Sequence, residues 1–181
     1  MSIRDDIKTV LISEDQIRER CKELGRQITK EYGERNEAPL LVALLRGSVP
    51  FLAELMKYIE LDIQYDFIDV TSYSGTKSTG DIRILKDLET SAEGKDILLV
   101  EDIIDTGRTI YAVKSMFKNK GTKSVRVATL LDKPCRRVMD INAEYVGFEV
   151  GDYFVVGYGL DYNQRFRALP YIGIPNEEVC R

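Results

Sequence analysis

Two adjacent carboxylic acids and a glycine-containing turn stand together in the stretch 97–110, ILLVEDIIDTGRTI. The apolar residues at its start predict a buried strand that ends at Val100, and Glu101 and Asp102 follow directly. The turn 105–109 comes next and leads into a predicted helix. A turn at a helix N-terminus presents free N–H groups and the positive end of the helix dipole. This turn is therefore suited to bind a phosphate group.

The two acids are not suited to bind that phosphate, because their charges would repel it. Glu101 and Asp102 are better explained if they bind ribose hydroxyls, or a magnesium ion held by those hydroxyls. Thr106 and Thr109 add hydroxyl donors to the turn. The residues thus point to a ligand with a phosphate, a neighbouring sugar diol and a metal. The alternative is that Asp105 only caps the helix and that the acids form a solvated turn.

Other kinds of chemistry are excluded by residue type. The chain has no histidine, which removes Ser-His-Asp and Cys-His mechanisms and histidine-based metal sites. Acid–base chemistry must then use carboxylates, Lys or Tyr. Cys21 lies on a helical apolar stripe and is predicted to be a small core residue. Cys21, Cys135 and Cys180 are scattered and odd in number, which argues against a disulfide framework and favours a reducing cytoplasm.

Length and composition predict a single domain, residues 1–181. Its 26 Lys and Arg against 30 Asp and Glu give a net charge of −4, which argues against duplex nucleic acid as the main partner. No apolar run reaches the ~18–20 residues that span a bilayer, so no membrane association is expected. The first 16 residues contain no apolar stretch of signal-peptide length.

The elements that must position these residues alternate along the chain. A helix is predicted from Ser13 to Gly33, with a capping box formed by Ser13 and Gln16. Further strands are predicted at 40–45, 62–70, 82–85 and 125–131, helices at 50–59 and 107–119, and a loop at 71–81. The aromatic-rich stretch from Ile141 onward is expected to form a flap at the edge or the ends of the sheet. This order predicts an α/β fold with a mainly parallel twisted sheet flanked by helices.

The segment VEDIIDTGRT (100–109) resembles the phosphoribosyl-pyrophosphate signature of the type I phosphoribosyltransferases. The rest of the chain resembles the hypoxanthine–guanine branch of that family in its short bacterial form. The segments that carry this resemblance are LLVALLRGSVPF (40–51), TSYSGTKSTGDIRILKDL (71–88), LLDKP (130–134) and VGFEVGDYFVVGYGLDYNQRFRALPYIG (146–173). The resemblance implies the fold of that family, with a small hood from both chain ends over the base site. It also implies purine salvage, in which a 5-phosphoribosyl group moves from phosphoribosyl pyrophosphate to nitrogen 9 of hypoxanthine or guanine.

The resemblance also implies roles for residues around the turn. Asp105 matches the candidate general base, and magnesium is the implied cofactor. The ribose and phosphate set is Glu101, Asp102, Asp105, Thr106, Gly107, Arg108 and Thr109. The metal set is Glu101, Asp102 and Asp161.

Further sets lie outside the central motif. The base-binding set is Lys133, Phe154, Val155, Leu160 and Asp161, and the pyrophosphate set is Arg46, Gly47 and Arg167. Arg46 stands where many relatives have Lys, in a loop that carries a non-proline cis peptide in the family. Ser72 and Tyr73 match a mobile loop over the site. From residue type alone, Lys133 would be a solvated surface lysine and Phe154 a core residue.

Alternatives remain at this point. One is a regulatory nucleotide- or RNA-binding protein on the same fold, and another is a transferase for adenine or uracil. The expected partners are phosphoribosyl pyrophosphate and a 6-oxopurine, with no nucleic acid, and a second copy in a homodimer or homotetramer. A site with a guanine pocket, a phosphate cradle and a pyrophosphate subsite also predicts inhibition by guanosine tetraphosphate.

Overall fold

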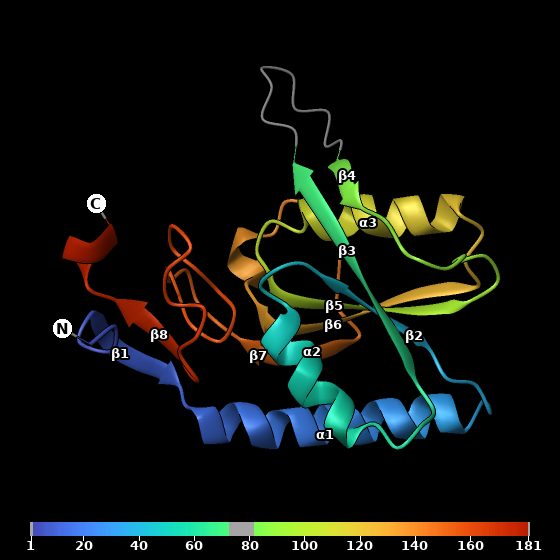
Figure 1. Ribbon diagram of the computed structural model, residues 1–181, viewed down its shortest axis with the longest axis horizontal. Helices are drawn as coiled ribbons and strands as arrows, with labels where there is room; N and C mark the ends of the chain where they lie inside the picture. The colour runs from blue at the N-terminus through green and yellow to red at the C-terminus, as the bar shows by residue number, and fades with distance from the viewer. Residues whose placement is uncertain (1, 73–81, 181) are drawn as a thin grey trace.

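A six-stranded sheet lies at the centre of this computed structural model, which describes residues 2–72 and 82–180 (Figure 1). The strand order is β4-β3-β2-β5-β6-β7, and all neighbours are parallel except β3 and β4. The strands are β2 (Leu40–Leu44), β3 (Gln64–Ser72), β4 (Ile82–Lys86), β5 (Asp96–Ile104), β6 (Ser124–Asp132) and β7 (Tyr145–Glu149). The predicted mainly parallel α/β sheet is confirmed.

Helices cover both faces of this sheet, as Figure 1 shows. α1 (Glu14–Gly33) and α2 (Val49–Leu55) pack on one face with Leu98 and Val100 of β5. α3 (Arg108–Asn119) packs on the other face with Ile97 and Leu99. Side chains of a strand alternate between its two faces, so a strand covered on both sides must be apolar at every position. This explains the continuous apolar runs in β2 and β5.

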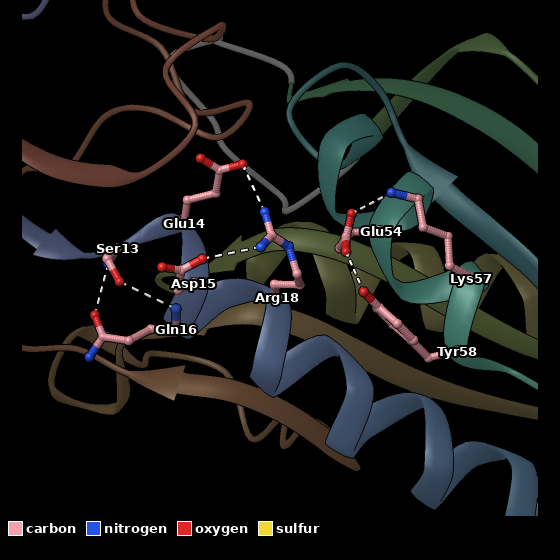
Figure 2. Close-up of polar contacts among 8 residues, drawn as sticks. All are labelled: Ser13, Glu14, Asp15, Gln16, Arg18, Glu54, Lys57 and Tyr58. Carbon is pink, nitrogen blue, oxygen red and sulfur yellow. Dashed lines mark hydrogen bonds and ion pairs between the residues drawn. The ribbon is translucent and has the colours of Figure 1, made fainter.

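Helix α1 begins as its sequence predicts (Figure 2). The Ser13 hydroxyl accepts the Gln16 backbone N–H at 3.3 Å, and the Gln16 side chain accepts the Ser13 N–H at 2.8 Å. The helix ends at Gly33, also as predicted. Cys21 is fully buried, and burial raises the pKa of its thiol to about 12. The prediction that Cys21 is a core residue is confirmed.

Several predicted boundaries are wrong. The helix predicted at 50–59 ends at Leu55, where a 3-10 helix follows it. Strand β5 does not end at Val100 but continues through both acids to Ile104, because its pairing with β6 persists as far as Ile104 and Asp132. The change from apolar to acidic residues suggested the earlier end, but both acids and the two isoleucines after them belong to the strand. The predicted loop at 71–81 is wrong at its first two residues, which pair with β4. Tyr73 and the rest of that loop lie outside the described residues, as does the side chain of Ser72.

The two chain ends form a separate small sheet. β1 (Ile7–Ile12) pairs antiparallel with β8 (Ile172–Pro175), and Figure 1 shows both beside the main sheet. The C-terminal stretch is therefore divided, because β7 joins the main sheet and β8 joins β1. Short 3-10 helices complete the described elements: η1 (Met56–Tyr58), η2 (Pro134–Arg136) and η3 (Glu177–Cys180). Among the described residues, no helix has the length and apolar character that crossing a bilayer requires.

Candidate active site

The predicted phosphate turn lies between β5 and α3, at the carboxyl end of the parallel strands. Gly107 is the N-cap of α3, and its carbonyl accepts the Tyr111 N–H at 2.9 Å. Its φ of +80° lies in the left-handed region that favours glycine. Ligands of open α/β sheets bind at this end of the strands. The Arg108 N–H donates to the Thr106 hydroxyl at 3.4 Å. The structure therefore confirms a glycine turn at a helix N-terminus, a position where backbone N–H groups commonly bind anions.

A neighbouring segment supports this turn from outside. The Val138 and Met139 N–H groups both donate to the Thr106 carbonyl, at 3.0 and 3.2 Å. The Arg137 side chain packs against Gly107, and its Cδ would lie 2.9 Å from a Cβ added there. A side chain at 107 would thus strain the backbone and require the Arg137 side chain to move. Sequence analysis missed this support, because nothing in the local pattern joins the two segments.

The two acids, Glu101 and Asp102, lie in a closely packed environment. Both side chains keep some exposure, but desolvation raises the pKa of Asp102 to about 6. Burial raises the pKa of Glu101 well above its usual value, and the charge of Asp102 raises it further. The Asp102 carboxylate accepts the Ile103 N–H at 2.7 Å. Negative charge is therefore left partly uncompensated, as expected for groups that bind a cation or hydroxyl donors.

This raised pKa makes a prediction about folding stability. Because the pKa is higher in the folded state, Asp102 contributes stability below about pH 4 that is lost as the pH rises through about 6. The shift from 3.8 to about 6 corresponds to about 3 kcal/mol. The free energy of unfolding is measured by urea unfolding in EDTA at pH 4 and pH 8. Asp102→Asn should remove most of the difference between the two pH values. Asp15→Asn, at an exposed position on α1, is the matched control. An unchanged pH dependence in Asp102→Asn would contradict the prediction.

The predicted pyrophosphate loop contacts Asp102 directly. The Leu45–Arg46 peptide is cis, which confirms the expected non-proline cis bond. A Cβ added at Gly47 would lie 1.5 Å from the Asp102 Oδ2 atom. A Cβ added at Gly159 would lie 1.9 Å from the Gly47 carbonyl oxygen. Three segments far apart in sequence therefore meet through backbone that has no room for side chains.

Asp161 and Arg167 lie at the same place. They form an ion pair with an O–N distance of 2.7 Å, and Arg167 also donates to the Gly159 carbonyl at 2.7 Å. The positive charge of Arg167 opposes the rise in the pKa of Asp102, and the negative charge of Asp161 adds to it. The structure thus brings together residues that sequence analysis placed in the metal and pyrophosphate sets.

The base-binding set contains a reversal of what residue type suggests. Lys133 is buried, with 5% of its surface exposed, and its ammonium group donates to the Tyr153 carbonyl at 2.6 Å. Phe154 is 52% exposed and meets Tyr162 edge-on, with ring centroids 5.8 Å apart. Both expectations from residue type alone, a solvated lysine and a core phenylalanine, are wrong. A buried ammonium near an exposed aromatic ring suits a flat heterocycle that carries a carbonyl oxygen.

The remaining predicted residues contribute differently. Val155 and Leu160 are buried in the core cluster on the α1 face of the sheet, so packing explains them without a ligand. Arg46 and Arg108 are exposed. Thr109 is half-buried in the first turn of α3.

Asp105 contacts an arginine that sequence analysis did not single out. Its Oδ1 atom lies 3.0 Å from the Nε atom of Arg136, in η2. Arg136 also donates to Asp152 at 3.1 Å. The only sequence signal is the pair of arginines at 136 and 137, shortly after Lys133.

The described residues contain no group of three or more acids or cysteines that could hold a metal ion. Asp161 therefore does not complete a protein cage with Glu101 and Asp102. Magnesium usually keeps several waters and binds one or two carboxylates together with substrate phosphates. The acid pair Glu101 and Asp102 fits an ion held in that way, largely by the substrate.

A cavity of about 380 Å³ lies at the opposite, amino end of the strands. Its lining includes Glu37, Asp62, Lys95, Asp96 and Lys123. Lys123 is already paired with Glu37 and Asp96. Lys123 is therefore not available to bind an anion, and the candidate site remains the carboxyl end of the sheet.

Comparison with known proteins agrees with this geometry. Residues 13–163 match the family described as "Phosphoribosyl transferase domain". A curated hypoxanthine-guanine phosphoribosyltransferase from Streptococcus mutans is 52% identical over 178 residues, which cover 98% of both chains. One from Streptococcus thermophilus is 50% identical with the same coverage. The crystal structure of a hypoxanthine phosphoribosyltransferase from Staphylococcus aureus is 47% identical and has a TM-score of 0.92, with 98% of this chain and 96% of that chain covered.

Proposed function

Because this chain belongs to the phosphoribosyl transferase family, we infer that it is a purine salvage enzyme that makes IMP or GMP. It transfers the 5-phosphoribosyl group from phosphoribosyl pyrophosphate to nitrogen 9 of hypoxanthine or guanine and releases pyrophosphate. The observation that carries this inference is the buried Lys133 near the exposed Phe154 ring, in a chain that also presents a phosphate turn at α3. Nothing in the comparisons supports the regulatory alternative.

Each segment of the site has a proposed task. The turn at Gly107 binds the 5′-phosphate, and Glu101 and Asp102 bind the ribose hydroxyls. Phe154 stacks on the purine, and Lys133 donates to its 6-oxo group. As nitrogen 9 bonds to the ribose C1′ atom, the C1′–oxygen bond to pyrophosphate breaks. Asp105 accepts the purine proton at nitrogen 7.

Magnesium fits this arrangement as a cofactor that accompanies phosphoribosyl pyrophosphate. When bound, it neutralises charge on the departing pyrophosphate. Glu101 and Asp102 would hold it together with the ribose hydroxyls, and Asp161 would hold a second ion beside Arg167. The raised pKa of Asp102 supports this assignment, because a carboxylate without enough nearby positive charge is stabilised by a cation.

A product assay tests the proposed function. Purified protein is mixed with magnesium, phosphoribosyl pyrophosphate and, separately, hypoxanthine, guanine, xanthine, adenine and uracil. We expect IMP and GMP to form, with adenine and uracil inert. The rate with xanthine shows how this third 6-oxopurine compares with hypoxanthine and guanine as a substrate. No product with any base, despite binding of phosphoribosyl pyrophosphate, would favour the regulatory alternative.

Lys133→Met tests base recognition. The variant loses a charged hydrogen bond to the 6-oxo group, worth ~1.5–3 kcal/mol, so kcat/KM for guanine and hypoxanthine should fall by roughly 10–100-fold. The KM for phosphoribosyl pyrophosphate should stay unchanged. Lys118→Met, at an exposed position on α3, is the control and should match the wild type. Equal kcat/KM in Lys133→Met and the wild type would remove Lys133 from base binding.

Guanosine tetraphosphate is a further proposed ligand of the same site. It is a guanine nucleotide that carries a pyrophosphate at each end of its ribose. It can therefore fill the base pocket, the phosphate turn and the pyrophosphate loop together. Inhibition should be competitive with phosphoribosyl pyrophosphate in steady-state kinetics. Absent or noncompetitive inhibition would exclude this binding mode.

We also propose that residues 1–181 form one phosphoribosyltransferase domain, since the pairing of β1 with β8 joins the two ends outside the matched region. Assembly into a homodimer or homotetramer and a cytoplasmic location remain predictions. Sedimentation measures the oligomeric state, and cell fractionation measures the location.

A further inference from the structure

Arg136 joins two acidic residues across the candidate site. Its Nε atom lies 3.0 Å from Asp105 Oδ1, and its Nη1 atom donates to Asp152 Oδ1 at 3.1 Å. Asp105 Oδ1 is buried and accepts no hydrogen bond from the described residues. Arg136 therefore acts on this oxygen as a nearby charge. The ion pair is thus made at the Oδ1 atom of this carboxylate.

Asp152 connects this pair to the segment that carries the base-binding side chains. The next residue, Tyr153, offers the carbonyl that holds the Lys133 ammonium group, and Phe154 follows it. The hydrogen bond to Asp152, and then the charge of Asp105, raise the pKa of Arg136. The arginine is thus anchored first to the base-binding segment and second to Asp105.

We propose that Arg136 is a positioning residue for the transfer reaction: it fixes one oxygen of Asp105 so that the other oxygen faces the purine. Through Asp152 it also ties the orientation of Asp105 to the segment 152–154 that binds the base. This inference rests on the proposed role of Asp105 as general base. The competing explanation is an ordinary surface ion pair, because the side chains of Arg136 and Asp105 are 49% and 41% exposed. Such surface pairs contribute little to stability.

Two substitutions of Arg136 separate these explanations. Arg136→Met keeps an unbranched side chain but removes the guanidinium group and its charge. It should lower kcat by roughly 10–100-fold with KM for phosphoribosyl pyrophosphate within about twofold. Arg136→Lys restores the charge without the forked geometry and should recover part of kcat. Arg18→Met is the matched control, because Arg18 also bridges two acids, Glu14 and Asp15, on α1 (Figure 2). The control should keep the wild-type kcat.

A double-mutant comparison shows whether Arg136 acts through Asp105. In an Asp105→Asn background, adding Arg136→Met should cause no further loss of kcat, because the group that it positions is already disabled. Asp152→Asn alone should lower kcat several-fold by loosening Arg136. Thermal unfolding of each variant checks that the fold is kept. If Arg136→Met does not fold, the same kinetic comparison is made with Arg136→Lys and Asp152→Asn.

The outcomes distinguish this inference from the proposed function. Normal kcat in Arg136→Met together with impaired Asp105→Asn would overturn the role of Arg136 and leave Asp105 as the base. An equal loss from Arg136→Met in both backgrounds would also overturn it, because Arg136 would then act independently of Asp105. Normal kcat in Asp105→Asn would remove the base assignment itself, and this inference with it.

Discussion

Replacement of Asp105 by Asn should lower kcat by roughly 10²–10⁴-fold, the contribution of a positioned general base. The variant keeps the size of the side chain and the backbone N–H groups of the turn, so phosphate binding should be retained. KM for phosphoribosyl pyrophosphate should therefore stay within about twofold of the wild-type value. The expected result is a large effect on turnover with little effect on substrate binding.

Steady-state kinetics with hypoxanthine and phosphoribosyl pyrophosphate measure both parameters. Asp15→Asn makes the same chemical change at an exposed position on α1 and should leave both parameters unchanged. If Asp105→Asn raised KM and kept kcat, the carboxylate would serve in binding and not in proton transfer. If both parameters stayed at wild-type values, Asp105 would have no role in the reaction. The structure gives it no capping role either, because Gly107 is the N-cap of α3.

Gly47→Ala should have the second largest effect, a fall of about 100-fold in kcat/KM for phosphoribosyl pyrophosphate. The added Cβ would lie 1.5 Å from Asp102 Oδ2 and 2.6 Å from its Cγ, so either the acid or the loop must move. Displacements of about 1 Å in a catalytic site are enough to cost ~10²-fold. Because Gly47 also contacts Gly159, both the ribose and the pyrophosphate contacts should weaken.

Gly94→Ala separates this effect from a general loss of stability. Gly94 has a φ of +70° and no atom within 4 Å of an added Cβ, so alanine there strains the backbone without touching the site. It should destabilise the fold by ~1–2 kcal/mol and leave kcat/KM unchanged. Calorimetry with phosphoribosyl pyrophosphate measures binding directly. Normal binding by Gly47→Ala would show that the contact with Asp102 does not shape the site.

Local patterns predicted most of the elements. The Ser13 capping box and Gly33 delimit α1, because both signals act within one turn of the helix. The apolar runs of β2 and β5 predicted strands covered on both faces. The end of β5 could not be predicted in this way, because pairing with β6 keeps Glu101 and Asp102 in the strand.

The same division holds for the site. The sequence by itself determined the glycine turn at the N-terminus of α3, for which we propose phosphate binding, because this turn is a local feature of the chain. Only the tertiary structure decided that Lys133 is buried and Phe154 exposed, against the tendency of each residue type. Only the tertiary structure brought Gly47 against the Asp102 carboxylate and paired Arg136 with Asp105. The physical reason is that parallel strands bring their carboxyl ends together whatever their distance in sequence, so contacts between those ends leave no local pattern.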